Sequence, residues 1–165
     1  MLFITFGLPG SGKTFVGEIL AQKFEFYFHD ADIDLPDDMK DSLIKNKIIT
    51  DDMRDRFFEE VAKSIQVLQA NFKHIVVAQT FIKEKYRKKM LKQFPDAKFL
   101  FVTTPNGIRE SRLLARTAYP IALPYARQMV ANFESPQVEH VILDNSLDGE
   151  KFICNQLQKI LIKEN

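Results

Sequence analysis

The chain has 165 residues and a formal net charge of +1 at pH 7, and its apolar and charged fractions are ordinary for a globular protein. This length predicts one domain over residues 1–165, with a sizeable core. The small net charge argues against strong sequence-independent binding to nucleic acid, and no apolar run is long enough for a membrane span. The single cysteine, Cys154, excludes an internal disulfide and, with no targeting segment visible, favours a cytoplasmic protein.

Short apolar segments alternate with longer amphipathic segments along the chain. In chain order, strands are predicted at 2–6, 24–29, 74–79, 97–103 and 138–143, and helices at 13–24, 51–70, 83–93, 106–116 and 148–163. The strand segments are rich in Phe, Val and Ile, as expected of strands that are covered on both faces. Thr50 is the predicted N-cap of the helix at 51–70. The alternation predicts an α/β fold with a five-stranded parallel sheet and helices on both faces.

The stretch GLPGSGKT (7–14) follows the first predicted strand and opens the first predicted helix. It carries the phosphate-loop pattern G-x-x-x-x-G-K-[ST], in the strand–helix context that this pattern requires. Glycines let backbone N–H groups approach phosphate oxygens, and the helix N-terminus favours negative charge. Lys13 is expected to reach the β- and γ-phosphates, and Thr14 to bind Mg²⁺. The residues expected to hold ATP are Gly7, Pro9, Gly10, Ser11, Gly12, Lys13 and Thr14.

Three aspartates, Asp30, Asp32 and Asp34, follow the second predicted strand. If the strand continued to residue 34, alternation would put all three on one side. A carboxylate beside a phosphate loop can order Mg²⁺ through water, or accept the proton of an attacking hydroxyl. We expect the metal role for Asp30 and the hydroxyl role for Asp32. The alternative is an acidic loop that caps a helix after Pro36.

Several segments together resemble the gluconate kinases, small P-loop kinases of sugar acids that are related to shikimate kinase. They are the phosphate loop, the D-x-D after the second strand, IITDDMRDRF (48–57), VVAQTFIKEKYRKKML (76–91) and IRESRLLAR (108–116), in order over nearly the whole chain. The resemblance implies a P-loop NTPase fold of three α/β/α layers with a small lid at about 112–126. It also implies transfer of the γ-phosphoryl group of ATP to a hydroxyl of a small metabolite, either gluconate or another sugar acid, or a shikimate-like compound.

The resemblance assigns substrate contacts residue by residue. Asp32 matches the aspartate that meets the substrate hydroxyl. Arg54 matches the arginine of the family's T-D-x-D-R block, whereas Arg56, with Glu59 three residues later, resembles the R-x-x-E of shikimate kinase. Both arginines therefore stay open as the one that faces the substrate.

After the third strand, Lys83, Tyr86 and Arg87 match the family's K-x-x-Y-R, and Tyr86 and Arg87 are expected to contact substrate. Thr80, directly after that strand, is a candidate hydrogen-bonding partner of the acceptor, with a helix cap as the alternative. Other acceptor-side positions differ from the family, since Leu35 stands where the family has His. The resemblance therefore specifies phosphoryl transfer more closely than it specifies the acceptor.

Three arginines, Arg109, Arg112 and Arg116, recur at spacings of three and four residues and so share one helix face. A guanidinium that arrives as a lid closes can stabilise the transferred phosphoryl group. The resemblance to the family's E-R-L-x-x-R lid helix favours Arg112 and Arg116, which join Lys13 and Asp32 as the expected catalytic residues. The alternative is a solvated basic face.

Two other functions fit the same residues. A nucleoside or nucleotide kinase of similar fold would need further arginines after the second and third strands to hold a phosphate acceptor. A nucleotide-binding regulator without transferase activity would be indicated by a pocket sealed by Leu35, Phe57 and Phe58. For the kinase we expect a small hydroxylated substrate, no nucleic-acid or membrane partner, and a monomer or homodimer.

Overall fold

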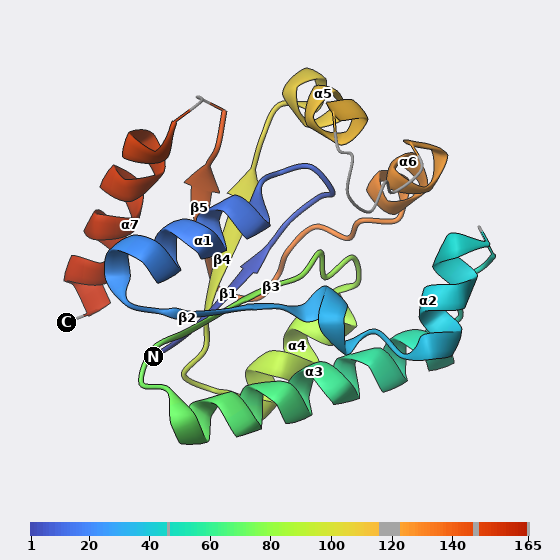
Figure 1. The fold of residues 1–165 in the computed structure, drawn as a ribbon, viewed down its shortest axis with the longest axis horizontal. Coiled ribbons are helices and arrows are strands. Elements are labelled where there is room, and N and C mark those ends of the chain that lie inside the picture. The colour runs from blue at the N-terminus through green and yellow to red at the C-terminus, as the bar shows by residue number, and fades with distance from the viewer. Residues whose placement is uncertain (46, 116–122, 147–148, 165) are drawn as a thin grey trace.

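Five parallel strands form the centre of the molecule, in the order β2-β3-β1-β4-β5 (Figure 1). The computed structural model describes residues 1–45, 47–115, 123–146 and 149–164. The strands are β1 (Leu2–Phe6), β2 (Tyr27–Asp30), β3 (Ile75–Ala78), β4 (Lys98–Thr103) and β5 (His140–Asp144). The helices are α1 (Lys13–Phe24), α2 (Asp37–Ile44), α3 (Asp51–Asn71), α4 (Glu84–Gln93), α5 (Asn106–Ala115), α6 (Leu123–Ala131) and α7 (Glu150–Glu164), with a 3₁₀ helix, η1 (Ala31–Asp34), after β2.

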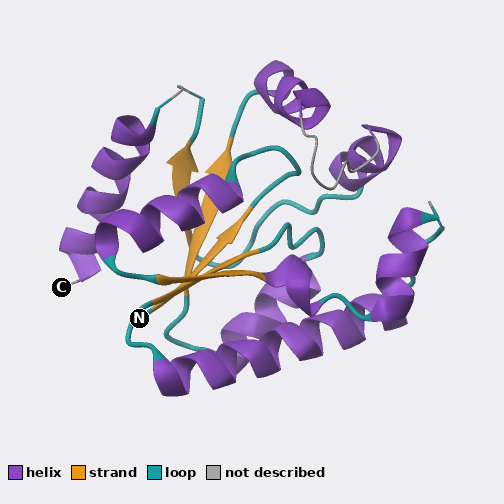
Figure 2. Cartoon of the chain, in the orientation of Figure 1, coloured by secondary structure: helices purple, strands orange, loops and turns teal. Residues whose placement is uncertain are grey.

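The central strand β1 shows how the two faces of the sheet are covered. Its alternate residues Leu2, Ile4 and Phe6 pack into a core with apolar side chains of α3 and α4. Phe3, from the other face, packs with apolar side chains of α1 and α7. Figures 1 and 2 show these helix pairs on opposite sides of the sheet. The predicted three-layer α/β/α arrangement is therefore confirmed, and so is the five-stranded parallel sheet.

The condition under which the three aspartates after β2 would share one side is not met. The strand ends at Asp30, whose carboxylate accepts the N–H of Asp32 and so begins η1. The aspartates consequently do not share one side. Asp34 turns away to bond the side chains of His29 (2.6 Å) and Ser64 (2.7 Å), which ties η1 to β2 and α3.

Helices α2, α5 and α6 gather around the end of the sheet toward which the strands point (Figure 1). Two of them, α2 and α6, are absent from the predicted elements, although a helix after Pro36 was one alternative. In parallel sheets ligands bind beyond the carboxyl ends of the strands. The fold therefore surrounds this end of the sheet with helices that can contact a bound molecule.

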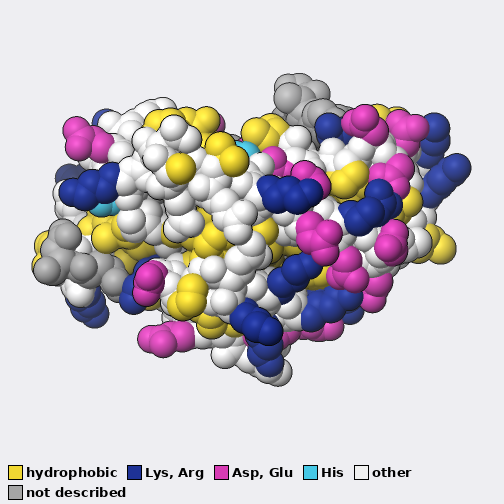
Figure 3. All heavy atoms as spheres, turned by 90° about the horizontal axis from the view of Figure 1, so that it is seen from below, with side chains coloured by type: hydrophobic (Ala, Val, Ile, Leu, Met, Phe, Trp, Pro, Cys, Tyr) yellow, Lys and Arg dark blue, Asp and Glu magenta, His cyan; other side chains and the backbone are white. Residues whose placement is uncertain are grey.

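The face formed by α3 and α4 carries mixed charges. Figure 3 views the molecule from this side and shows basic and acidic side chains interspersed. Lys63 pairs with Glu60 at 2.7 Å, for example, and Lys89 with Glu59 at 3.3 Å. Within the described ranges, no helix has the length and apolar character needed to cross a bilayer.

Candidate functional site

The phosphate loop between β1 and α1 is a backbone turn that side chains would obstruct. Gly12 has a φ of 94°, and a Cβ there would lie 2.1 Å from Nδ2 of Asn145. A Cβ at Gly7 would lie 2.4 Å from the carbonyl oxygen of Val102. These distances are too short for a Cβ atom. The packing of Val102 and Asn145 against the loop therefore requires glycine at both positions.

Loops that follow β4 and β5 hold the phosphate loop from behind. The carbonyl of Ser11 accepts hydrogen bonds from Asn145 Nδ2 (2.8 Å) and Thr104 Oγ1 (2.9 Å). Arg109, only 3% exposed, donates from its guanidinium to the carbonyl of Pro9 at 3.0 Å. Thr104 and Asn145 were not predicted, although each directly follows the end of a strand, where parallel sheets bind their ligands.

Two of the three cations predicted to neutralise phosphate, Lys13 and Arg112, lie at this loop. The ammonium of Lys13 donates to the carbonyls of Gly7 and Leu8, at 3.1 Å each. Arg112 donates to the carbonyl of Asn145 at 3.4 Å, and its guanidinium lies 3.7 Å from the position of a Cβ on Gly12. Arg116 lies outside the described residues, as do residues 117–122 of the expected lid.

A hydroxyl and a carboxylate lie side by side at the start of α1. Thr14 Oγ1 donates to Asp30 Oδ2 at 3.5 Å. Within the described ranges, no group of three or more His, Cys, Asp or Glu residues could hold a metal ion. Mg²⁺ commonly binds through one or two protein oxygens and takes its other ligands from phosphates and water. The Thr14–Asp30 pair therefore fits Mg²⁺ that arrives with a nucleotide.

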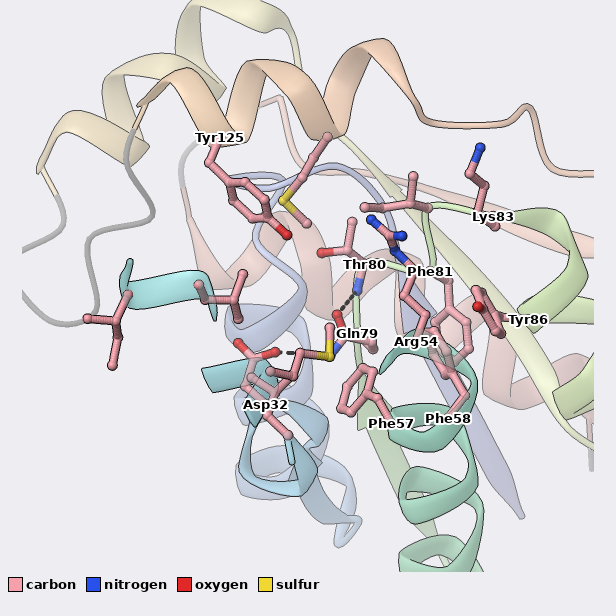
Figure 4. A pocket seen from close by; sticks show the side chains of 16 residues that line it. Asp32, Arg54, Phe57, Phe58, Gln79, Thr80, Phe81, Lys83, Tyr86 and Tyr125 are labelled. Atoms are coloured by element: carbon pink, nitrogen blue, oxygen red, sulfur yellow. Dashed lines mark hydrogen bonds between the residues drawn. The ribbon is translucent and has the colours of Figure 1, made fainter. Parts of the chain in front are cut away.

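A cavity of about 560 Å³ lies next to this region, between α2, α3 and α6 (Figure 4). Its volume lies in the range of sites for small organic ligands. The lining residues are Asp32, Leu35, Met39, Leu43, Ile44, Arg54, Phe57, Phe58, Gln79, Thr80, Phe81, Ile82, Lys83, Tyr86, Tyr125 and Met129. Because Asp30 contacts Thr14 and Asp32 lines the cavity, η1 connects the phosphate loop to the cavity.

Asp32 is held in the cavity wall by Gln79. The amide nitrogen of Gln79 donates to Asp32 Oδ1 at 3.0 Å, and its amide oxygen accepts the backbone N–H of Thr80 at 2.6 Å (Figure 4). The second bond fixes which end of the amide faces the carboxylate. Gln79 is thus a site residue that the sequence analysis missed, although it directly follows β3. Thr80, which was predicted, lines the cavity.

The structure separates the two candidate arginines of α3. Arg54 lines the cavity, where its guanidinium extends from α3 and donates to the carbonyl of Ile49 at 2.7 Å. Arg56 lies outside the cavity and pairs on the surface with Asp38 at 2.6 Å and Asp52 at 3.3 Å. Of the two, Arg54 is therefore the one positioned to meet a molecule in the cavity.

Arg87 does not line the cavity, contrary to its expected contact with substrate. It is fully buried, with charge-assisted bonding to Glu84. Its guanidinium also donates to the carbonyls of Phe81 (2.8 Å) and Glu134 (2.6 Å). Because these bonds engage the guanidinium within the protein, Arg87 supports the cavity lining through the Phe81 backbone instead of contacting a ligand.

The ring of Tyr86 does line the cavity, as part of an aromatic cluster. It stacks on Phe58 with ring centroids 4.3 Å apart, and Phe58 stacks in turn on Phe81 at 4.8 Å. The hydroxyl of Tyr86 points outward and donates to the carbonyl of Asp51 at 3.4 Å. Tyr86 therefore offers the cavity a ring surface.

Tyr125 reaches down from α6 with its hydroxyl directed into the cavity, toward Thr80 (Figure 4). Burial raises the pKa of Tyr125 above its ordinary value. The positive charge of Arg54 lowers that pKa and the negative charge of Asp32 raises it. Both charges therefore act on the same enclosed space, and the Tyr125 hydroxyl stays protonated there at neutral pH.

A family model described as AAA domain matches residues 2–136. Two relatives are similar in sequence. A probable gluconokinase of Xenopus tropicalis is 32% identical over 91 residues, which cover 55% of this chain and 48% of that protein. The thermoresistant gluconokinase of Escherichia coli (strain K12) is 23% identical over 136 residues, covering 82% of this chain and 76% of that protein. The match thus spans about half the length of the first relative.

Among solved structures, a gluconokinase from Sinorhizobium meliloti 1021 superposes with a TM-score of 0.80. The alignment covers 99% of this chain and 96% of that chain, at 21% sequence identity. At this identity the similarity concerns the fold. Its extent means that the arrangement of the sheet and its covering helices is common to both proteins.

Proposed function

We propose, since this chain belongs to the AAA domain family, that it is an ATP-dependent kinase that phosphorylates a hydroxyl group of a small molecule. The observation that carries the proposal is the continuity between a phosphate loop and an enclosed cavity. Asp30 contacts Thr14 of the loop, and Asp32, two residues later, lines the cavity. The similarity to two gluconokinases supports the same reaction class.

The loop residues have the properties needed to hold the ATP phosphates. The glycines leave the backbone accessible, α1 begins at Lys13, and the Lys13 ammonium already lies over the loop carbonyls. Thr14 and Asp30 would bind Mg²⁺, which neutralises charge on the phosphates. Arg112, beside Gly12, would add positive charge as the phosphoryl group moves.

Asp32 is the residue that would act on the acceptor. The acceptor hydroxyl forms a bond to the γ-phosphorus as the bond from that phosphorus to ADP breaks, and its proton passes to Asp32. Gln79 keeps the carboxylate directed for this transfer. Arg54, on the same cavity, would bind an anionic group of the acceptor, such as the carboxylate of a sugar acid or of a shikimate-like compound.

Two features of the cavity argue against a nucleotide acceptor and against a regulator without transferase activity. A nucleotide acceptor would need several cations for its phosphate, yet Arg54 and Lys83 are the basic residues among the described lining residues. A regulator would be favoured by a pocket that Leu35, Phe57 and Phe58 seal. These three instead line a cavity large enough for a ligand.

The test is a coupled assay of ATP consumption over a panel of sugar acids, polyols, shikimate, nucleosides and aromatic hydroxy acids. At least one compound should raise turnover above the basal rate. Lys13→Ala should abolish this increase, because the phosphates lose their cation. Asp32→Asn should abolish it while calorimetry still detects binding of a non-hydrolysable ATP analogue.

An unstimulated basal rate that Lys13→Ala leaves unchanged would contradict the kinase proposal. Binding of the ATP analogue under those conditions would favour the regulator. Absence of both binding and turnover would contradict nucleotide binding by the loop itself.

A further inference from the structure

We infer that the cavity selects an amphipathic hydroxy acid, with one hydroxyl at Asp32, one anionic group at Arg54 and an apolar or aromatic body between them. This inference rests on the proposed function and narrows its acceptor. A sugar acid such as gluconate carries a hydroxyl on nearly every carbon between its two ends. An amphipathic hydroxy acid therefore needs an apolar cavity wall, whereas a sugar acid needs a wall with many hydrogen-bonding groups.

Most of the residues that line the cavity around these two positions are apolar. Phe57, Phe58 and Phe81 border the cavity, although each is at least 96% buried by the protein and so presents only a small part of its ring to it. Leu35 and Met39 line it beside η1 and in α2, and Met129 contributes from α6. An apolar ligand body would gain free energy by leaving water for this surface.

This wall is held in place by unusual backbone geometry. Phe81 has a φ of 50°, in the left-handed region that side-chain-bearing residues rarely adopt. The buried guanidinium of Arg87 donates to the Phe81 carbonyl at 2.8 Å and so helps to hold that conformation. Strained residues persist where the surrounding structure determines them, and they concentrate at ligand sites. The aromatic wall is therefore a built feature.

Beyond the hydroxyls of Thr80 and Tyr125, the cavity offers few groups for additional hydroxyls. The amide of Gln79 is engaged at both ends, by Asp32 and by the backbone of Thr80. The ammonium of Lys83 pairs with Glu134 at 3.2 Å, and the hydroxyl of Tyr86 donates to the carbonyl of Asp51. A polyhydroxylated chain would consequently face the phenylalanine rings with hydroxyls that have lost their water partners, which is unfavourable.

Besides Lys83, which pairs with Glu134, the charged residues that line the cavity lie at two separate positions. Asp32 extends from η1 and Arg54 from α3, with the phenylalanine side chains of α3 nearby (Figure 4). Tyr125 lies close enough to both for each charge to affect its hydroxyl. A ligand with a hydroxyl at one end and a carboxylate at the other matches this division. Arg54 pairs with Asp51 at 3.4 Å, and a neutral alcohol would add no second anion to it.

The experiment compares three compounds by calorimetry in the presence of Mg²⁺ and a non-hydrolysable ATP analogue. They are para-(hydroxymethyl)benzoate, benzyl alcohol and gluconate. We expect para-(hydroxymethyl)benzoate to bind at least about tenfold more tightly than gluconate, because the cavity wall favours the ring. It should also bind at least about tenfold more tightly than benzyl alcohol, which lacks the anion. Turnover with ATP is measured in parallel.

A pair of exposed isoleucines provides the matched variants. Ile44 lines the cavity and is 70% exposed, whereas Ile162 is 75% exposed on α7, at the other side of the molecule. Neither side chain supports the core, so both variants should fold. Ile44→Gln should weaken binding of para-(hydroxymethyl)benzoate about threefold to tenfold without weakening gluconate binding. Ile162→Gln should change neither.

The outcomes separate this inference from the proposed function. Equal or tighter binding of gluconate overturns the inference and leaves the kinase proposal standing. Tighter binding of para-(hydroxymethyl)benzoate without phosphorylation supports the inference and contradicts the kinase proposal for this compound class. Binding of none of the three compounds overturns the inference, while the acceptor panel continues to test the kinase.

Discussion

The side-chain amide of Gln79 holds the carboxylate of Asp32, with 3.0 Å between the amide nitrogen and Oδ1. Gln79 is itself fixed by the backbone N–H of Thr80, so the orientation of Asp32 derives from the loop that leaves β3. A carboxylate that accepts a proton must point at the hydroxyl that loses it. Gln79 is thus a positioning residue for the proposed reaction.

Gln79→Leu is expected to lower kcat about tenfold, a part of the ~10²–10⁴-fold that a general base contributes, with little change in KM. The reason is that Asp32 remains but loses its orienting donor. Gln79→Glu would set a second carboxylate beside Asp32, and the acid limb of the pH–rate profile should move to higher pH because neighbouring carboxylates disfavour each other's ionisation. The exposed Gln69→Leu on α3 is the control and should leave the kinetics unchanged. A loss of stability in Gln79→Leu with a normal kcat would contradict the positioning role.

Gly12→Ala is expected to lower the free energy of unfolding by about 1–3 kcal/mol, because the new Cβ meets the Asn145 amide and the positive φ is unfavourable. Binding of ATP should be lost as well, since the loop must shift. Gly107, in α5, provides the control, because a Cβ added there would have no atom within 4 Å. Gly107→Ala should leave stability unchanged or raise it by up to about 1 kcal/mol. Urea denaturation and calorimetry measure the two effects.

Arg54→Met and Arg56→Met distinguish the two arginines of α3. Arg54→Met should raise KM for an anionic acceptor about tenfold or more, because a charge-assisted contact is lost. Arg56→Met should leave KM within about twofold, because Arg56 pairs with Asp38 and Asp52 on the surface, where such pairs contribute little. The reverse ranking of the two KM values would show that the acceptor binds outside the cavity.

Tyr86 gives the protein a dependence on alkaline pH. Burial, and next the Asp55 carboxylate, raise the pKa of Tyr86 from 10.0 to about 12. Because the folded state holds this proton more tightly than the unfolded chain, the stabilisation is fully present below pH 10 and is lost as the pH rises toward about 12. The loss should be about 2 kcal/mol.

Urea denaturation of Tyr86→Phe from pH 9 to pH 11.5 checks this prediction, with the exposed Tyr27→Phe as the control. The variant Tyr86→Phe should show a shallower decline in stability than the wild type, whereas Tyr27→Phe should follow the wild type. Parallel curves for all three proteins would mean that other groups cause the decline.

The elements that local patterns determine were predicted accurately. The bounds of β1 and α1 agree with the structure, because an apolar run, three glycines and an amphipathic segment each act locally. Helix α6 was missed because its sequence lies next to prolines in a stretch that lacks a clear hydrophobic period. Its cavity residue Tyr125 was missed with it.

The position of a candidate side chain was most predictable where a motif sets its direction. The phosphate loop does so for Lys13 and Thr14. The K-x-x-Y-R pattern does not indicate which side of α4 faces the core, and Arg87 is buried because Glu84, the nearby Phe81 carbonyl and the distant Glu134 carbonyl provide partners. Partners brought together by the tertiary structure cannot be read from one segment.

The sheet assigns the two halves of the site to different strands. Loops after β4 and β5 hold the phosphate loop through Thr104 and Asn145, whereas Asp32 and Gln79 come from the ends of β2 and β3. Strand β1 lies between these two pairs of strands, and the end of β2 reaches both halves because Asp30 contacts Thr14 of the phosphate loop. Substitutions around α2 and α3 can therefore change the cavity without altering the phosphate loop, which makes this half of the molecule the place where new specificities can evolve or be engineered.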